Sequence, residues 1–397
     1  MHRFLRIILA AAVRLIPRRP DFWVFGNVWQ RYSDNPKYLF EHLSSTPSAA
    51  VRVAWISTSS TVVRELRNAG YEAYLRWSMG GVIACVRAGV YVYNCSAEEI
   101  NRFLCAGAHR VNLWHGIPVK FIGHTYDARH TPLMQHPKPK NASRFLRYRT
   151  SPEYFLVITP FLRNTIFAEA FSVAEEQSVY GGYPRCDPFF WSMDKLSSAC
   201  ASAGYRWLFN RLKNSGSMKI GIWMPSWRED GRDFITELGF DFRVLDRLLN
   251  QSGVLLIVKP HPYSVSAIRQ HGDSTYGNIL FLEEDCDVYP LLALTDFMVT
   301  DYSSILFDYL LLNKPLMLVC HDYAILKSQR GTYSQFDYLF ELHALKSFHE
   351  FKDRITTGHL RVEEWQVSLR SRVWGGLMGP FSKNLALRIK TIVAENR

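Results

Sequence analysis

The sequence predicts an α/β chain made of two Rossmann-like domains, each built around a parallel β-sheet. Three observations lead to this prediction. Short apolar, β-rich runs alternate with helical stretches along most of the chain, which is the pattern of βαβ units. The 397 residues are enough for two domains of ordinary size. Hydrophobic residues make up 48% of the chain, so two sizeable cores can form.

The predicted strands fall into two series. In the first half they are Phe22–Phe25, Val51–Ile56, Ala73–Leu75, Val90–Tyr93, Val111–Trp114 and Phe155–Ile158. In the second half they are Ile220–Met224, Leu255–Val258, Ile279–Leu282, Phe297–Thr300 and Leu316–Val319. The predicted helices between them are Tyr38–Leu43, Val62–Ala69, Phe161–Phe171, Phe242–Gln251 and Ile305–Leu312. Strands separated in this way align in parallel, and ligands of such sheets bind at the carboxyl ends of the strands.

The polar, weakly patterned stretch Ser197–Ser217 is the predicted join between the domains. We therefore expect an N-terminal domain over residues 20–196 and a C-terminal domain over residues 197–397. Two similar domains around one join are expected to face each other across a cleft. The helical pattern from Glu363 to Arg397 leaves open a return of the chain onto the first domain.

Residues 1–19 carry five arginines and no acidic residue. The apolar run from Ile7 to Val13 is too short to cross a bilayer, which takes about 20 residues. Five apolar side chains would share one face of a helix: Phe4, Ile7, Ile8, Ala11 and Leu15. This pattern predicts a segment that lies on an anionic membrane surface. The alternatives are an amphipathic helix packed on its own protein and, less well matched, a secretory signal.

The net charge of +11 favours an anionic partner, which could be nucleic acid, anionic lipid or a phosphate-rich substrate. A basic region over residues 101–150 contains Trp114, His115 and Lys120 and is expected to face phosphates, with a plain solvated face as the alternative. No nucleic-acid-binding motif accompanies it, so nucleic acid is not an expected partner. The seven cysteines form no C-x-x-C pair and are expected to be buried free thiols.

Several motifs of known chemistry are missing from the sequence. It contains no P-loop, no G-x-S-x-G elbow, no H-E-x-x-H zinc motif and no G-x-G-x-x-G dinucleotide fingerprint. Asp285 and Asp287 have the spacing of a metal-binding pair but fall in a predicted turn. We therefore expect neither a cofactor nor a metal site.

The motif TDYSS follows the predicted strand that ends at Thr300 and precedes a predicted helix. Asp and Ser are good N-caps, and a helix start presents unpaired N–H groups that bind phosphate. Asp301, Ser303 and Ser304 are therefore candidates for phosphate binding. An ordinary helix cap is the alternative interpretation.

The motif KPHP follows the predicted strand Leu255–Val258. Its two prolines stiffen the exit from the strand and remove N–H donors. Lys259 and His261 would be held at the ligand-binding edge of the sheet, where a cation and an imidazole suit a diphosphate. A structural histidine beside prolines is the alternative.

The motif WHGIPVK follows a strand in the first half, and its glycine allows the backbone to turn. His115 is then presented at the end of the strand, with Lys120 a few residues later. An imidazole can accept the proton of an attacking hydroxyl, an effect worth roughly 10²–10⁴-fold in rate. A non-catalytic histidine is the alternative.

Two further turns are weaker candidates for a functional site. Arg228 in the motif PSWR could pair bidentately with a phosphate, or it could form an ion pair on the surface or between domains. The turn Gly182–Asp187 is interpreted as a loop at a domain edge without a function of its own.

Taken together and in this order, WHGIPVKFIG, KPHP and TDYSSILFDYLLLNKPLMLV resemble the CDP-glycerol glycerophosphotransferase family of teichoic acid and capsule synthesis. DNPKYLF, GGYPRCD, MPSWRED and RGTY extend the resemblance over roughly residues 20–340. The resemblance implies a GT-B-like architecture in which the second domain holds most of the nucleotide. It also implies a peripheral enzyme at the cytoplasmic face of the membrane that releases CMP.

The resemblance further implies roles for the candidate residues. His115 would be the base that deprotonates the acceptor hydroxyl. Lys259 and His261 would stabilise the donor diphosphate and the leaving CMP. Lys120, Arg228, Asp301, Ser303 and Ser304 would contribute to substrate binding. Positioning and charge neutralisation are the main contributions of a protein to phosphoryl transfer, which fits this set.

We therefore expect transfer of glycerol phosphate, or a related polyol phosphate, from a CDP-polyol to a hydroxyl of a polyprenyl-diphosphate-linked acceptor. The lack of a large additional domain is compatible with a primase, but length does not decide between a primase and a polymerase, and the choice between glycerol and ribitol is also left open. One alternative is a GT-B glycosyltransferase that uses a nucleotide sugar. The other is a non-catalytic protein that binds a membrane surface or nucleic acid.

Overall fold

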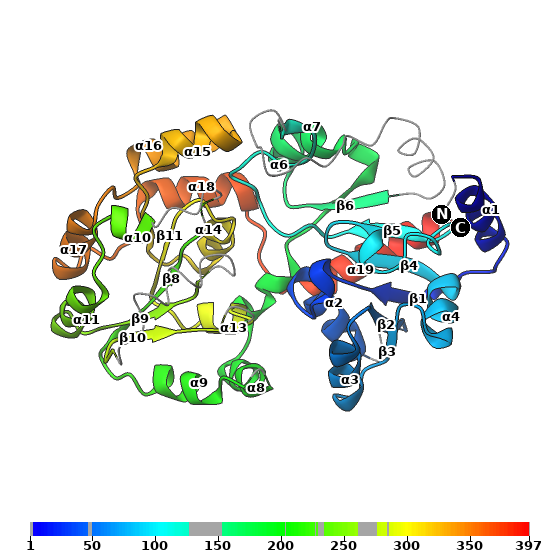
Figure 1. Ribbon diagram of the computed structural model, residues 1–397, viewed down its shortest axis with the longest axis horizontal. Coiled ribbons are helices and arrows are strands. Elements are labelled where there is room, and N and C mark those ends of the chain that lie inside the picture. Colours follow the sequence, from blue (N-terminus) through cyan, green and yellow to red (C-terminus); the bar gives the residue numbers. More distant parts are fainter. Residues whose placement is uncertain are drawn as a thin grey trace. The chain divides into compact units, whose positions relative to one another are not determined.

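The computed structural model describes residues 3–46, 50–126, 153–202, 204–226, 228, 234–260, 276–283 and 286–396. The chain forms two compact units. The first unit consists of Met1–His115, His136–Asp187 and Leu377–Arg397, and the second consists of Gly116–Gln135 and Pro188–Gly376. Each unit has its own β-sheet with helices packed around it (Figure 1). The prediction of an α/β chain with two parallel sheets is confirmed.

The sheet of the first unit contains seven parallel strands in the order β3-β2-β1-β4-β5-β6-β7. Their bounds are β1 Arg19–Phe25, β2 Arg52–Ser57, β3 Ala73–Leu75, β4 Ala88–Tyr93, β5 His109–Asn112, β6 Glu153–Val157 and β7 Ser178–Tyr180. The strand order reverses between β1 and β4. In open parallel sheets, ligands bind outside the carboxyl ends of the strands at such a point.

Helices surround this sheet, and several begin at serine caps. Ser59 and Ser78 each accept a backbone N–H bond at the start of the helix that follows, which satisfies a donor that the helix itself leaves unpaired. The helices of the first unit are α1 Arg3–Arg14, α2 Asp34–Ser44, α3 Ser60–Asn68, α4 Met79–Arg87, α6 Pro160–Leu162, α7 Ala168–Phe171 and α19 Phe381–Glu395. A π-helical turn, Arg163–Phe167, joins α6 to α7.

Helix α1 packs on the first unit through one of its sides. Val13 is buried in the core of this unit, and Leu9 and Ala10 pack against it. The following Arg18 donates hydrogen bonds of 2.6–2.9 Å to the carbonyl oxygens of Cys85, Ala88, Leu104 and Ala106. On the other side of α1, Ile8 is 50% exposed and Leu15 is 85% exposed. Within the described parts of the chain, no helix combines the length and the apolar character that a bilayer crossing requires.

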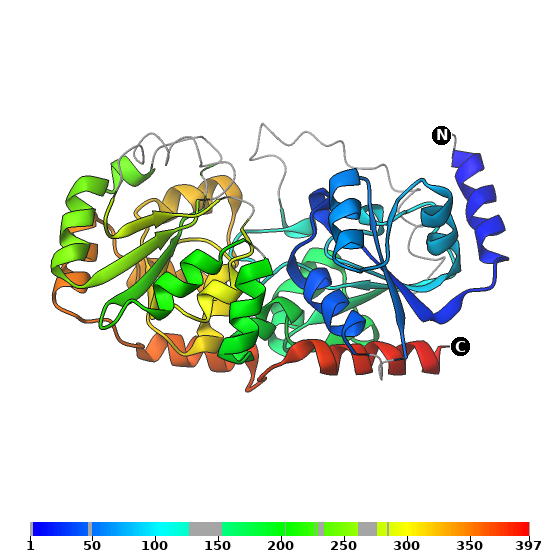
Figure 2. The same cartoon turned by 90° about the horizontal axis from the view of Figure 1, so that it is seen from below.

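Helix α19 belongs to the first unit, although the second unit separates it from the rest of that unit in sequence (Figure 2). Asp187 accepts backbone N–H bonds from Phe381 and Ser382 and so caps the start of the helix. Leu385 and Ile389 are buried on the face that packs against α2 and β7. The predicted assignment of residues 377–397 to the C-terminal domain is therefore wrong, whereas the return that the sequence left open occurs.

The sheet of the second unit contains five parallel strands in the order β10-β9-β8-β11-β12. Their bounds are β8 Lys219–Met224, β9 Val254–Val258, β10 Ile279–Phe281, β11 Phe297–Thr300 and β12 Leu316–Leu318. The strand order reverses between β8 and β11, which repeats the arrangement of β1 and β4. The predicted site residues follow β5 in the first sheet and β8, β9 and β11 in the second.

The helices of the second unit pack their apolar stripes onto this sheet. In α11, for example, Leu245, Leu248 and Leu249 are buried in a core that includes Trp223 and Val258. The helices are α8 Met193–Ser202, α9 Arg206–Lys213, α10 Phe234–Glu237, α11 Phe242–Gln251, α13 Tyr289–Leu292, α14 Ile305–Tyr309, α15 Tyr323–Arg330, α16 Asp337–Leu342, α17 Phe348–Thr356 and α18 Glu364–Trp374.

The predicted join at Ser197–Ser217 is wrong. This stretch contains the end of α8 and the whole of α9, and the chain passes between the units at Asp187–Pro188 instead. Both helices are polar on most of their surface and bury only a narrow stripe, which includes Leu196, Cys200, Leu208, Phe209 and Leu212. Such a narrow stripe gives a weak periodic signal, and the prediction therefore mistook the helices for a linker.

Candidate active site

His115 lies on a turn beyond the end of β5. The strand ends at Asn112, two residues earlier than predicted, because Trp114 adopts a left-handed conformation with φ of 54°. Gly116 continues the turn with φ of 125°, a value that a residue with a side chain rarely adopts. The side-chain oxygen of Asn112 accepts the backbone N–H of Trp114 at 2.9 Å, which ties the turn to the end of its own strand.

Three residues from elsewhere in the first unit hold this turn, and we call them the His115 bracket: Asp34, Asn35 and Arg185. The Asn35 amide donates to the carbonyl oxygen of Trp114 at 2.8 Å. The Arg185 guanidinium donates to the carbonyl oxygen of His115 at 2.8 Å and to the Asp34 carboxylate at 3.0 Å. The Asn35 side-chain oxygen accepts the backbone N–H of Arg185 at 3.2 Å. The sequence pattern of Gly182–Asp187 indicates only a loop at a domain edge and does not reveal these contacts of Arg185.

Among the described residues, Cys95 and Trp114 contact the imidazole of His115. Its Nδ1 lies 3.3 Å from the Sγ of Cys95, which follows β4. The ring of Trp114 lies against it, with 4.0 Å between the centroids. Because β4 and β5 are adjacent and β4 borders the reversal of the strand order, His115 lies where a parallel sheet is expected to bind its ligand.

The turn that carries Cys95 depends on a buried carboxylate. Glu99 accepts the backbone N–H groups of Asn94, Cys95 and Ser96 at 2.8–3.1 Å. Burial nevertheless raises the pKa of Glu99 to about 7, because the three N–H bonds only partly offset the loss of hydration. Cys95, which contacts His115, is thus held in place by hydrogen bonds between the backbone of its turn and Glu99.

His115 is held in its neutral form. Burial lowers its pKa to about 4, with the Asp34 carboxylate opposing this shift and the Arg185 guanidinium adding to it. The residue still reaches solvent in part, although its surroundings remove much of the water around the ring. A neutral imidazole has a free lone pair, so the ring can accept a proton from a hydroxyl.

Lys120 belongs to the second unit, unlike His115. It forms an antiparallel bridge with Thr332, and the neighbouring Phe121 N–H donates to the carbonyl oxygen of Gly331 at 3.0 Å. The Val119 carbonyl oxygen accepts the N–H of Tyr333 at 3.0 Å. The motif RGTY therefore pairs with the segment that follows His115.

In the second unit, Arg228 and Asp301 join the loops after β8 and β11. Arg228 donates to Asp301 at 2.9 Å and to the two oxygens of Asp322 at 2.6 and 3.1 Å. Asp301 also accepts the backbone N–H of Ser226 at 3.0 Å, and the Tyr302 hydroxyl donates to Asp322 at 2.7 Å. The side chains of Arg228, Asp301 and Asp322 are at most 4% exposed.

Arg228 thus forms an ion pair, as the alternative interpretation held, but the pair is buried within the second unit and lies neither on the surface nor between domains. Burial alone would lower the pKa of Arg228, but Asp301 and Asp322 raise it above its usual value. Burial likewise opposes ionisation of Asp322, but the bonds and charge of Arg228 lower its pKa below the usual range. Substrate binding by Arg228 or Asp301 stays a prediction, and it would require part of this network to open. No motif in the sequence indicates Asp322, which follows β12.

The other predicted residues of the second unit follow neighbouring strands of its sheet. Lys259 follows β9, and its backbone N–H donates to the carbonyl oxygen of Trp223 on β8. Ser303 and Ser304 follow β11, are partly exposed, and directly precede α14. The Ser304 side chain makes no capping bond to this helix. His261 lies outside the described residues.

Metal-binding clusters and disulfides are not found in the described ranges. No three side chains of the His, Cys, Asp and Glu types come together in an arrangement that could hold a metal ion. All seven cysteines are free, and five of them are buried, as the sequence analysis expected for most of them.

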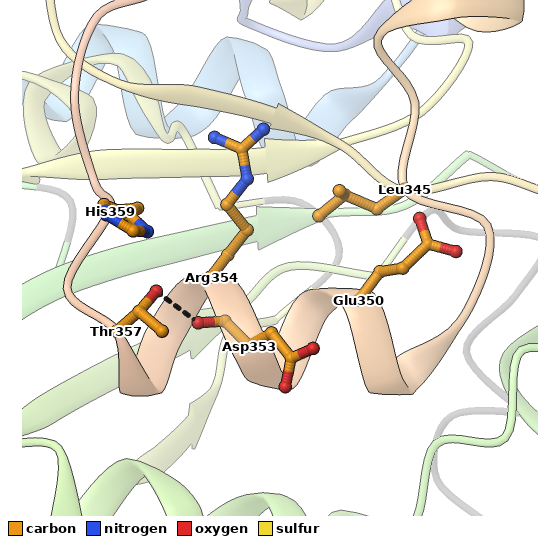
Figure 3. Close-up of a pocket in the computed structure, with 6 residues that line it drawn as sticks. All are labelled: Leu345, Glu350, Asp353, Arg354, Thr357 and His359. Carbon is orange, nitrogen blue, oxygen red and sulfur yellow. Dashed lines mark hydrogen bonds between the residues drawn. The ribbon is translucent and has the colours of Figure 1, made fainter.

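A cavity of about 280 Å³ lies beside α17 in the second unit (Figure 3). Its lining residues are Leu345, Glu350, Asp353, Arg354, Thr357 and His359. Arg354 is paired with Glu363, and Asp353 with His349. None of the predicted site residues lines this cavity, so it is separate from the candidate active site.

Comparison with known proteins gives consistent matches. The family model described as CDP-glycerol:poly(glycerophosphate) glycerophosphotransferase matches residues 8–372. A teichoic acid glycerol-phosphate transferase of Staphylococcus aureus is 26% identical over 299 residues, which is 74% of this chain and 72% of the relative. A teichoic acid poly(glycerol phosphate) polymerase of Staphylococcus epidermidis is 25% identical over 319 residues, which is 77% of this chain but 40% of that longer protein.

Among solved structures, a variant of the wall teichoic acid polymerase TagF is similar to this chain with a TM-score of 0.75. The alignment covers 98% of this chain and 93% of that one at 20% sequence identity. A likeness at this level of identity concerns the fold, and it agrees with the predicted GT-B-like class.

Proposed function

The chain belongs to the CDP-glycerol:poly(glycerophosphate) glycerophosphotransferase family, and we propose that it transfers glycerol phosphate from CDP-glycerol to a hydroxyl of a lipid-linked acceptor in teichoic acid synthesis. A polyprenyl diphosphate is the proposed carrier of the acceptor. The names of the matched relatives support the reaction class and the polymer.

One structural observation carries this proposal. His115 is a neutral imidazole on a turn at the ligand-binding edge of the first sheet, and side chains from two distant segments hold that turn. A histidine that served only to fill a core would not need such an arrangement. Proton transfer by a positioned, neutral imidazole is the chemistry that this geometry supports best.

In the proposed reaction, the acceptor oxygen attacks the phosphorus that bears the glycerol. A new P–O bond forms, the diphosphate bond to the cytidine side breaks, and CMP leaves. His115 takes the proton of the acceptor hydroxyl. Lys259 and His261 would neutralise charge on the diphosphate, and the hydroxyls of Ser303 and Ser304 would donate hydrogen bonds to it.

The direct test offers the purified protein CDP-glycerol, CDP-ribitol and a set of UDP- and GDP-sugars together with a lipid-linked acceptor. We expect release of CMP from CDP-glycerol that depends on the acceptor, and a mass gain of one or more glycerol phosphate units on the lipid. Release of UDP or GDP with transfer of a sugar would instead favour a glycosyltransferase. CMP release from CDP-ribitol alone would retain the reaction class but change the donor.

We further propose that α1 brings the enzyme to the cytoplasmic face of an anionic membrane. The exposed side of this helix carries Ile8 and Leu15, while its other side packs on the first unit. Arginines flank the apolar residues, as in helices that lie in the interface of an anionic bilayer. Both interpretations of the N-terminal segment, packing on the protein and contact with lipid, are therefore compatible with one helix.

A double substitution tests the membrane proposal without disturbing the packed side of α1. Ile8→Glu combined with Leu15→Glu is expected to release the protein from vesicles that contain anionic lipid, because each change removes apolar contact and adds repulsion. Sedimentation with the vesicles at moderate salt measures the effect. Thr61→Glu, a change in charge on α3, serves as the control. Unchanged sedimentation of the double variant would move the membrane surface to another part of the chain.

A further inference from the structure

We propose that Asp34, Asn35 and Arg185 are positioning residues for His115: they fix the turn that carries its imidazole and place a pair of opposite charges beside the ring. The inference rests on the proposed function only in taking His115 as the proton acceptor. None of the three residues needs to touch a substrate for this role.

The backbone of the turn explains why such a bracket is needed. Trp114 has φ of 54°, and residues with a side chain rarely adopt this left-handed conformation. Asn35 donates to the carbonyl oxygen of Trp114, and Arg185 donates to that of His115, at 2.8 Å each. These two carbonyl groups belong to the peptide bonds immediately before and after the Cα of His115. Asp34 also has a positive φ, 63°, so two unfavourable turns meet at the bracket.

The three bracket residues are linked to one another as well as to the turn. Asp34 pairs with the Arg185 guanidinium, and the Asn35 side chain accepts the Arg185 backbone N–H. Asn35 is fully buried, and the Arg185 side chain is 5% exposed. Loss of Asn35 or Arg185 therefore removes at least two of these contacts, and loss of Asp34 removes the ion pair with Arg185, so the orientation of His115 depends on all three.

The charges of the bracket act on the ring in opposite directions. Asp34 favours the protonated imidazole and Arg185 disfavours it, while burial is the largest influence. Among the residues that the structure describes, the other titratable group at the ring is Cys95, whose own pKa burial raises above its usual value, so it carries no charge there. Glu99 reaches the ring only through the Cys95 turn. Asp34 and Arg185 are thus the charged pair through which substitution can shift the titration of His115.

The experiment measures the titration of His115 by NMR in the full-length protein, independently of turnover. Arg185→Gln removes the positive charge and is expected to raise the pKa of His115, whereas Asp34→Asn is expected to lower it. Both variants are also expected to reduce kcat by about tenfold or more through misplacement of the ring, with KM for CDP-glycerol within twofold of the unaltered protein. In a His115→Ala background, Arg185→Gln is expected to cause no further loss.

Arg110→Gln provides a matched control. Arg110 lies in the same unit, its side chain is also 5% exposed, and it pairs with Glu153, whose side chain is 22% exposed, compared with 23% for Asp34. Arg110→Gln is expected to leave the pKa of His115 unchanged. An unchanged titration in both bracket variants, or an equal change in the Arg110 variant, would overturn the proposal. Full turnover of His115→Ala would instead count against His115 as the proposed base. The titration of His115 in the Arg185→Gln and Asp34→Asn variants would then still test whether the bracket acts on the ring.

Discussion

His115→Ala is expected to lower kcat by about 10²–10⁴-fold, the range typical for loss of a general base. The reason is that no other described titratable side chain near the turn can replace it: Cys95 is held as a neutral thiol and Asp34 is paired with Arg185. Donor binding should change little, because the proposed role concerns the acceptor proton. Turnover by CMP release and donor affinity by calorimetry measure the two effects separately.

His109→Ala is the control for this experiment. His109 is also a partly buried histidine of the first unit, at the start of β5 and thus at the other end of the strand from the candidate site. Its substitution should leave kcat within a few-fold of the unaltered enzyme. Equal losses in both variants would indicate general damage to the first unit, and full activity of His115→Ala would remove His115 from the mechanism.

The pH dependence follows from the same assignment. The base must be neutral, and His115 in the free enzyme has a pKa of about 4, so kcat/KM should hold as pH falls until it approaches 4 and then decline. In the reacting complex the donor diphosphate adds negative charge near the base and raises its pKa. The acid limb of kcat should therefore lie at higher pH than that of kcat/KM.

The second large effect concerns stability. Arg228→Met is expected to lower the free energy of unfolding by about 3–5 kcal/mol, because it leaves Asp301 and Asp322 buried without their cation. The loss should shrink as pH falls into the carboxyl range, since protonation removes the uncompensated charges. Denaturant unfolding at several pH values, followed by tryptophan fluorescence and circular dichroism, measures it.

A variant of an exposed ion pair in the same unit is the control. Lys327 pairs with Asp337 at the surface, and Lys327→Ala should leave the unfolding midpoint nearly unchanged. A second substitution, Asp322→Asn in the Arg228→Met background, should restore part of the lost stability. An Arg228→Met protein that is as stable at neutral pH as the original would show that the network contributes little.

The regular elements could be predicted well where burial is continuous. The predicted Phe297–Thr300 and Phe242–Gln251 have the same bounds as β11 and α11, because every residue of that strand is buried and the helix has a sharply divided surface. β7, three residues long with only Val179 fully buried, was missed, whereas the equally short β3 was predicted with its exact bounds. A run of three residues is therefore too short for local pattern alone to identify a strand consistently.

The candidate site was predicted in part for the same reason. His115, Lys259 and Ser303 follow apolar strands, and the strand ends of a parallel sheet are where ligands bind. Arg185 and Asn35 could not be found in this way. Their role depends on contacts with the His115 turn across 70 and 79 residues of sequence, which no local period records. Only their membership of motifs in the family resemblance marked them.

The return of α19 to the first unit has a consequence for synthesis on the ribosome. Most residues of the first unit leave the ribosome early. Gly182 and Asp187, however, contact α19, which is translated only after the whole second unit. A methyl group at Gly182 would lie 2.2 Å from the Phe381 ring, so the surface around Gly182 fits the start of α19 closely. During synthesis, the surface of the first unit around Gly182 and Asp187 therefore stays exposed to solvent and to chaperones until α19 leaves the exit tunnel.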